Sequence, residues 1–159
     1  MTLKLIQWLT TSLQGWSFSG GSLDVGSLAI PGRRPGPTVL IVEDDYLIAA
    51  LIERILLSAG YLVSGPIPRL SEAQGAASLE TVDGAILDVN LNGERVYPVA
   101  EILTKRNIPY LLITGYSGHH LPTEFAGRPR INKPFTGEEL LVALSNLPLE
   151  PVTTAAAVT

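Results

Sequence analysis

The sequence has 159 residues, enough for one domain with its own core plus extensions at its ends. Hydrophobic residues make up 46% and charged residues 16%, which argues against a disordered chain, and a net charge of −4 without a basic run argues against a nucleic-acid partner. No cysteine is present, so disulfides and thiol chemistry are excluded, and no apolar run approaches the roughly 20 residues that span a bilayer. We therefore expect a cytoplasmic protein with no firm membrane association.

The N-terminal residues are expected to lie outside the folded domain. Four apolar residues share one helical stripe: Leu5, Ile6, Leu9 and Leu13. Glycine and proline then become frequent up to Pro37, which is typical of a linker. We interpret residues 1–36 as an extension or linker, and the alternative is a short amphipathic helix that docks on a partner or a membrane surface.

Strands and helices are expected to alternate from Thr38 onward. Uninterrupted apolar runs, such as residues 39–42 and 85–87, are typical of strands buried on both faces, whereas apolar residues at helical spacing follow Tyr46. In chain order the expected strands are 39–42, 61–64, 85–88, 110–113 and 130–132, and the expected helices are 46–59, 71–79, 97–106 and 136–147.

Turn-forming and capping residues set several expected boundaries. The dipeptide Gly65-Pro66 is expected to end the second strand, and Ser71 to cap the following helix. Thr136 begins a capping box before the last helix. Residues 117–128 contain glycine and proline, so a full fourth helix is not expected there.

This alternation predicts a parallel sheet with right-handed crossovers. Five strands suit the doubly wound order 2-1-3-4-5, in which the carboxyl ends of strands one, three, four and five meet at one edge. We expect this domain to span residues 37–147 and the tail, residues 148–159, to be disordered.

Polar side chains follow the four strands that meet at this edge. They are Glu43 and Asp44 after the first, Asp88 at the end of the third, Thr114 after the fourth and Lys133 after the fifth. Three carboxylates repel one another unless a cation neutralises them, and oxygen ligands of this kind suit Mg²⁺. Lys133 offers a positive charge and Thr114 a hydroxyl donor for an anionic group. A carboxylate nucleophile, a divalent ion and a positioned lysine together predict phosphoryl transfer to an aspartate.

Each of these residues, taken alone, has an ordinary explanation. Thr114 alone would be a turn residue, and Lys133 alone a solvated charge. We interpret Asp45 as a helix N-terminal charge, and the adjacent His119 and His120 as exposed loop residues rather than metal ligands. The ordered set, with one member at each strand end, favours a functional site.

Four motifs together resemble a known family. They are residues 39–45 (V-L-I-V-E-D-D), Leu87-Asp88, Ile113-Thr114 and Lys133-Pro134-Phe135. In this order they are similar to the receiver domain of two-component response regulators, and the resemblance covers residues 37–147. It implies a five-stranded flavodoxin-like receiver fold.

The same resemblance implies a role for each site residue. Asp88 would be the phosphoacceptor, and Mg²⁺ would be held by Glu43, Asp44, Asp88 and the backbone carbonyl of Asn90. Thr114 and Lys133 would bind the phosphoryl oxygens, and the Lys133–Pro134 bond would be cis.

A narrower likeness concerns the fourth strand. Residues 109–116 (P-Y-L-L-I-T-G-Y) are similar to the P-F-x-F-A-T-G-Y signature of the FAT GUY single-domain response regulators, whose fourth helix is weak. Tyr110 and Leu112 replace phenylalanines of that signature, and Ile113 replaces its alanine. The likeness implies a sensor histidine kinase of the HWE or a related class, or a phosphotransfer protein, as partner.

Arg130 stands where most receiver domains carry an aromatic residue, three positions before the lysine. Switching by a threonine and an aromatic residue is therefore not expected here. We expect Tyr116 and residues 117–128 to transmit the signal instead, because they lie beside Thr114.

The leading hypothesis is a single-domain response regulator that is phosphorylated on Asp88 and acts by protein contact or as a phosphate sink. Such a protein is not an enzyme on a separate substrate, although it assists its own phosphorylation. One alternative is a docking module that works without phosphorylation. Another is a Mg²⁺-dependent phosphatase, but haloacid-dehalogenase-type enzymes place their two aspartates on one strand as D-x-D, whereas these carboxylates follow different strands.

Overall fold

The computed structural model describes residues 36–115 and 121–149. The expectations for residues 1–35, for Tyr116, for the pair His119 and His120, and for residues 150–159 lie outside this part of the chain.

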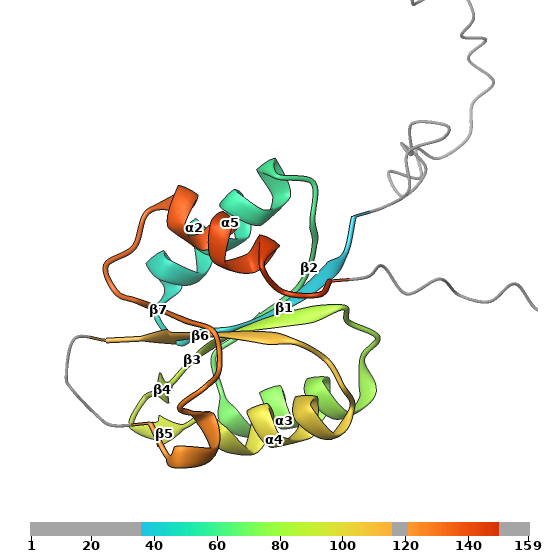
Figure 1. Ribbon diagram of the computed structural model, residues 1–159, viewed down its shortest axis with the longest axis vertical. Coiled ribbons are helices and arrows are strands. Elements are labelled where there is room, and N and C mark those ends of the chain that lie inside the picture. Colours follow the sequence, from blue (N-terminus) through green and yellow to red (C-terminus); the bar gives the residue numbers. More distant parts are fainter. Residues whose placement is uncertain (1–35, 116–120, 150–159) are drawn as a thin grey trace, which may run out of the picture. The chain divides into compact units, whose positions relative to one another are not determined.

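Five parallel strands form the central sheet of the domain (Figure 1). They are β1 (Thr38–Val42), β2 (Leu62–Ile67), β3 (Gly84–Asp88), β6 (Tyr110–Thr114) and β7 (Arg130–Asn132). Their order is β2-β1-β3-β6-β7, and every pairing is parallel, which confirms the predicted doubly wound topology. The three central strands are almost wholly buried, as their uninterrupted apolar sequences predict.

Helices cover both faces of the sheet (Figure 1). One face carries α2 (Tyr46–Ser58) and α5 (Gly137–Ser145), and the other carries α3 (Leu70–Leu79) and α4 (Tyr97–Lys105). Successive side chains of β1 alternate between two cores. Val39 and Ile41 pack in the core beneath α2 and α5, whereas Leu40 and Val42 pack in the core beneath α3 and α4. Both faces of the sheet are thus covered by packed helices, and polar side chains can reach solvent at its carboxyl edge.

A full helix between β6 and β7 is absent among the described residues, as expected. Of residues 121–128, only η2 (Thr123–Phe125) is helical, and it is a single 3₁₀ turn. Phe125 is buried and stacks on Tyr97 of α4, with the ring centroids 4.8 Å apart. This contact fixes the short connection against the helical layer.

The expected end of the second strand is wrong. The strand β2 continues through Gly65 and Pro66 to Ile67, with a shift of register against β1 between Leu40 and Val42. Because β2 is an edge strand, a proline without an N–H group interrupts the ladder without ending it. Gly65 has φ +92°, and a Cβ atom there would lie 2.7 Å from the carbonyl oxygen of Ile41, so the irregular register requires glycine at this position.

Ser71 does not cap α3, which is a second correction. The helix begins one residue earlier than expected, and the extended residue before it, Arg69, makes no side-chain capping bond. The carbonyl oxygen of Arg69 already accepts the first helical hydrogen bond, from the N–H of Ala73 at 2.9 Å, which places Ser71 inside the first turn. Instead, Glu72 in that turn interacts favourably with the positive N-terminal end of the helix dipole.

Asp45 stands at the N-terminus of α2, as expected, and the expected capping box of α5 is confirmed. Asp45 caps α2, because its Oδ1 accepts the N–H groups of Leu47 and Ile48 at 2.8 Å and 3.1 Å. Thr136 and Glu139 form the expected capping box of α5, although this helix ends at Ser145, two residues earlier than expected. No helix in the described part of the chain is long and apolar enough to cross a membrane.

Candidate functional site

Three strand ends bring the predicted site residues to one edge of the sheet. Glu43 and Asp44 directly follow β1, Asp88 is the last residue of β3, and Lys133 directly follows β7. Main-chain hydrogen bonds continue the ladders past these ends, from Glu43 N–H to the Ile67 carbonyl at 3.2 Å and from Lys133 N–H to the Thr114 carbonyl at 2.7 Å. The backbone beneath the site is therefore fixed by the sheet itself.

The three carboxylates form one cluster. Glu43, Asp44 and Asp88 each offer an oxygen, and these oxygens all lie within 4.8 Å of one another. Glu43 is 2% exposed and Asp88 6% exposed, whereas Asp44 is half-buried at the entrance. Three like charges this close would repel one another strongly without a neighbouring cation.

Lys133 supplies one such cation. Its Nζ lies 2.6 Å from Asp88 Oδ2 and donates to Glu43 Oε1 at 3.0 Å. The ammonium group also lies 2.7 Å from Glu43 Oε2, but not in the direction of a hydrogen bond. One lysine therefore bridges the two buried carboxylates.

Burial dominates the ionisation of Glu43. It raises the pKa of the carboxyl group to about 7, and the charge of Asp88 adds to the rise, while the hydrogen bond from Lys133 opposes it. Burial alone would lower the pKa of Lys133, but its hydrogen bonds to Asp88 and Glu43 outweigh this, so its pKa is raised and the ammonium stays charged.

The residues present fit a hard divalent cation. Glu43 Oε2 is buried and makes no hydrogen bond in the described part of the chain, so this oxygen remains available as a ligand. When all groups are ionised, three carboxylates and one ammonium leave two negative charges, which a divalent ion would balance. Carboxylate oxygens are the ligands that Mg²⁺ prefers.

A short hairpin beside the cluster escaped the sequence analysis. Strands β4 (Asn90–Leu91) and β5 (Glu94–Arg95) pair antiparallel across Asn92 and Gly93, which have φ angles of 51° and 93°. The Asn-Gly dipeptide is a strong signal for such a turn and could have revealed it.

The hairpin holds two of the carboxylates by main-chain donors. Asn92 N–H donates to Asp44 Oδ2 at 3.0 Å, and Asn90 N–H donates to Asp88 Oδ1 at 3.0 Å. The Asn90 carbonyl as a metal ligand stays a prediction.

Thr114 reaches the same edge but turns its hydroxyl elsewhere. It lies at the end of β6, one residue beyond the partner of Asp88, and its Oγ1 donates to Asn132 Oδ1 at 2.8 Å. No contact between this hydroxyl and the carboxylate cluster is seen among the described residues. Asn132 is a site neighbour that the sequence analysis missed; the only signal was a polar side chain next to Lys133 on a strand.

Arg130 lies on the exposed edge strand β7. Its guanidinium donates to the carbonyl of Ala126 at 3.4 Å and does not enter the cluster. The Lys133–Pro134 bond is cis, as expected.

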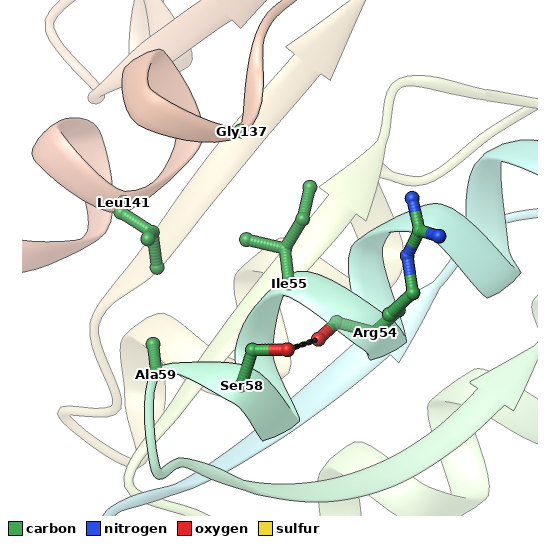
Figure 2. A pocket seen from close by; sticks show the side chains of 6 residues that line it. All are labelled: Arg54, Ile55, Ser58, Ala59, Gly137 and Leu141. Atoms are coloured by element: carbon green, nitrogen blue, oxygen red, sulfur yellow. Dashed lines mark hydrogen bonds between the residues drawn. The ribbon is translucent and has the colours of Figure 1, made fainter. Parts of the chain in front are cut away.

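A separate apolar hollow lies between α2 and α5 (Figure 2). It measures about 340 Å³, and its lining residues are Arg54, Ile55, Ser58, Ala59, Gly137 and Leu141. Ser58 is turned back onto its own helix, where its hydroxyl donates to the Arg54 carbonyl at 2.7 Å (Figure 2). No residue of the carboxylate cluster lines this hollow, so it is distinct from the site at the sheet edge.

Solved structures share this fold. The solution structure of SdrG from Sphingomonas melonis Fr1 is 37% identical with a TM-score of 0.64, and the match covers 71% of this chain and 97% of SdrG. The receiver domain of the sensor histidine kinase PA1611 from Pseudomonas aeruginosa PAO1, solved with a magnesium ion coordinated in its active-site cleft, is 26% identical with a TM-score of 0.61. That match covers 69% of this chain and 95% of the PA1611 domain.

One curated relative also matches. The uncharacterized transcriptional regulatory protein YbdJ of Bacillus subtilis (strain 168) is 30% identical over 116 residues, which are 70% of this chain and 51% of YbdJ. The chain thus spans about half the length of this relative. No family model matches the sequence.

Proposed function

Because the chain belongs to the receiver domains of response regulators, we propose that Asp88 accepts a phosphoryl group from the phosphohistidine of a sensor histidine kinase or a phosphotransfer protein. One observation carries this proposal: the buried Asp88 is paired with Lys133 at 2.6 Å in the middle of a three-carboxylate cluster. A buried aspartate with its own lysine and a place for a divalent ion is equipped to act as a nucleophile toward phosphorus.

The proposed step transfers one phosphoryl group. An oxygen of Asp88 forms a bond to phosphorus while the P–N bond of the phosphohistidine breaks, and the leaving imidazole nitrogen keeps the bond's electron pair. Lys133 offsets the negative charge at Asp88 and then binds a phosphoryl oxygen, and Thr114 offers its hydroxyl to a second oxygen.

The metal belongs to this proposal as well. We expect Glu43, Asp44, Asp88 and the carbonyl of Asn90 to hold Mg²⁺. When bound, the ion neutralises charge that gathers on the phosphoryl oxygens during transfer.

The partners are proposed from the sequence motif at the fourth strand. Residues 109–116 favour a kinase of the HWE or a related class, in the manner of the FAT GUY regulators. The phosphorylated protein then acts by contact with a further protein or removes phosphate from its kinase, and it processes no separate substrate. We place this exchange in the cytoplasm, where a kinase finds its ATP.

Intact-mass measurement after incubation with Mg²⁺ and acetyl phosphate tests the proposal. We expect the parent protein to gain one phosphoryl group and Asp88→Asn to gain none. Asp45→Asn is the matched control, because the Asp45 side chain caps α2, asparagine caps helices equally well, and the main-chain N–H that Asp45 donates to Glu43 is kept. If Asp88→Asn is labelled as strongly as the parent, Asp88 is not the acceptor and a docking role without phosphorylation becomes the better reading.

A further inference from the structure

The hydroxyl of Thr114 is held by a neighbour on the next strand. Thr114 and Asn132 are directly paired in the register of β6 and β7. Across this pair, Thr114 Oγ1 donates to Asn132 Oδ1 at 2.8 Å, within the ordinary range for a hydroxyl donor. The contact therefore depends on which residue stands opposite Thr114 in the sheet.

A hydroxyl group has only one proton to donate. While Thr114 donates to Asn132, it has no proton for a phosphoryl oxygen on Asp88. Asn132 and a phosphoryl group therefore compete for the same donor, and Thr114 must turn about its Cα–Cβ bond to exchange one acceptor for the other.

The two strands also tie this pair to the site lysine. Lys133 follows Asn132 directly, and its main-chain N–H donates to the carbonyl of Thr114 at 2.7 Å. The backbone of Thr114 is thus fixed, and the choice of acceptor is left to its side chain. Asn132 itself is exposed on an edge strand, so its side chain has no packing role that would explain its position.

We propose that Asn132 is a positioning residue that holds the Thr114 hydroxyl away from Asp88 in the resting protein and releases it when a phosphoryl group arrives. This inference rests on the proposed function of Asp88. Asn132 competes with the phosphoryl group for the Thr114 hydroxyl and so lowers the affinity of the site for that group. It thereby sets the fraction of the phosphorylated protein in which Thr114 contacts the phosphoryl group.

Beryllofluoride, which mimics an aspartyl phosphoryl group, provides the test in the presence of Mg²⁺. We expect Asn132→Ala to bind beryllofluoride about three- to tenfold more tightly than the parent, the range that one net hydrogen bond provides. Thr114→Val should bind more weakly than the parent. In the Thr114→Val background, Asn132→Ala should have no further effect, because the donor it would release is gone.

Asn146→Ala is the matched control. It removes the same side-chain atoms from an exposed asparagine at the end of α5, outside the site, and should leave the affinity unchanged. Equal affinity of Asn132→Ala and the parent would overturn the inference, and so would an equal gain in the Thr114→Val background.

A measurement without ligand separates this inference from the proposed function. Three-bond NMR couplings of Thr114 should report one rotamer in the parent and averaging in Asn132→Ala. A single unchanged rotamer in the variant would overturn the pairing. If the couplings change as expected but the parent neither binds beryllofluoride nor takes up phosphate, the proposed function fails, and the role assigned to Asn132 fails with it.

Discussion

The ionisation of Glu43 decides the net charge of the site and whether this carboxylate is free to bind a metal ion. Glu43 is buried beside another carboxylate, and only Lys133 offers it a cation among the described residues. Burial raises the pKa of Glu43 to about 7, so a large share of the metal-free protein carries a proton there at neutral pH. A metal ion that uses this oxygen must displace that proton.

We therefore expect Mg²⁺ affinity to depend on pH. Since binding releases a proton from Glu43, the affinity should rise by up to about tenfold per pH unit below pH 7 and level off above it. Isothermal titration calorimetry in two buffers of different ionisation enthalpy measures both the affinity and the protons released. An affinity that stays constant from about pH 5 to pH 8 would contradict the coupling of metal binding to a proton on Glu43.

The free energy of unfolding of Glu43→Gln tests the ionisation of the same carboxyl group. The pKa of Glu43 is raised from 4.5 to about 7, so the native state binds a proton that the unfolded state releases. The free energy of unfolding therefore falls as pH rises from 4.5 to about 7, because the buried carboxyl group must then ionise. At about pH 8 without metal, Glu43→Gln should raise the free energy of unfolding by about 1–3 kcal/mol while abolishing Mg²⁺ binding. Urea titrations at about pH 5 and pH 8 give the comparison, and a gain that is equal at both values would contradict it.

At the level of elements, the capping box of Thr136 and Glu139 shows how the local sequence sets the start of α5. Thr136 accepts the N–H of Glu139 at 3.2 Å, and Glu139 Oε2 accepts the N–H of Thr136 at 2.7 Å. Two hydrogen bonds to Thr136 also lower the pKa of Glu139, so its support for α5 is lost as pH falls through that lowered value.

Thr136→Ala should therefore destabilise the protein by about 1 kcal/mol. Ser71→Ala is the matched control, because Ser71 stands in the first turn of α3 without capping it and should change stability little. Urea unfolding followed by circular dichroism compares the two variants. A larger loss for Ser71→Ala than for Thr136→Ala would reverse the assignment of the caps.

The irregular register of β2 at Gly65 supplies a second prediction at the level of elements. Gly65→Ala places a methyl group 2.7 Å from the Ile41 carbonyl at a φ of +92°, and should cost about 1–3 kcal/mol of unfolding free energy. Gly75→Ala in α3 has open space and is the control, which should be neutral or stabilising. Denaturant titration of both variants distinguishes strain at Gly65 from a general effect of removing glycine.

The sequence predicts those features that depend on one strand at a time. Apolar runs identified the three central strands, and the convergence of Glu43, Asp88 and Lys133 followed from the parallel topology that the alternation of strands and helices implies. Gly65 and Pro66 wrongly predict the end of β2, because an edge strand tolerates an interruption that would end a central strand.

Asn132 could not be found in this way, because its bond to Thr114 depends on the register between two strands. The sequence does not show which residue stands opposite which. The cap predicted at Ser71 is wrong for a related reason: the sequence alone does not locate the first helical hydrogen bond of α3, which the Arg69 carbonyl accepts.

On the scale of the whole domain, helices on both faces leave only the edges of the sheet open to chemistry (Figure 1). The acidic cluster at the carboxyl edge draws on β1 and β3, and Lys133 follows β7, so a ligand there links segments that are distant in the sequence. Such a ligand should stabilise the fold as a unit.

Mg²⁺ should therefore raise the melting temperature of the domain, and a chelator should reverse the rise. At a concentration about 100 times its dissociation constant, a ligand specific for the native state contributes about 2.7 kcal/mol. Asp88→Asn should lose most of this effect, whereas Asp45→Asn should keep it. Thermal melts by circular dichroism with Mg²⁺ and with the chelator decide between these outcomes.

Both oxygens of Asp88 have fixed donors: Oδ1 accepts from Asn90 N–H, and Oδ2 faces the Lys133 ammonium. The orientation of the Asp88 carboxylate, the nucleophile of the proposed function, is therefore settled during folding, before any phosphodonor arrives. If the proposed function holds, a phosphorylated partner contributes little to the alignment of this carboxylate and mainly raises the effective concentration of the phosphoryl group near it. Small phosphoramidates, which have no surface for docking, should consequently react at the same aspartate. A high concentration of the small phosphodonor would replace the binding of a protein partner.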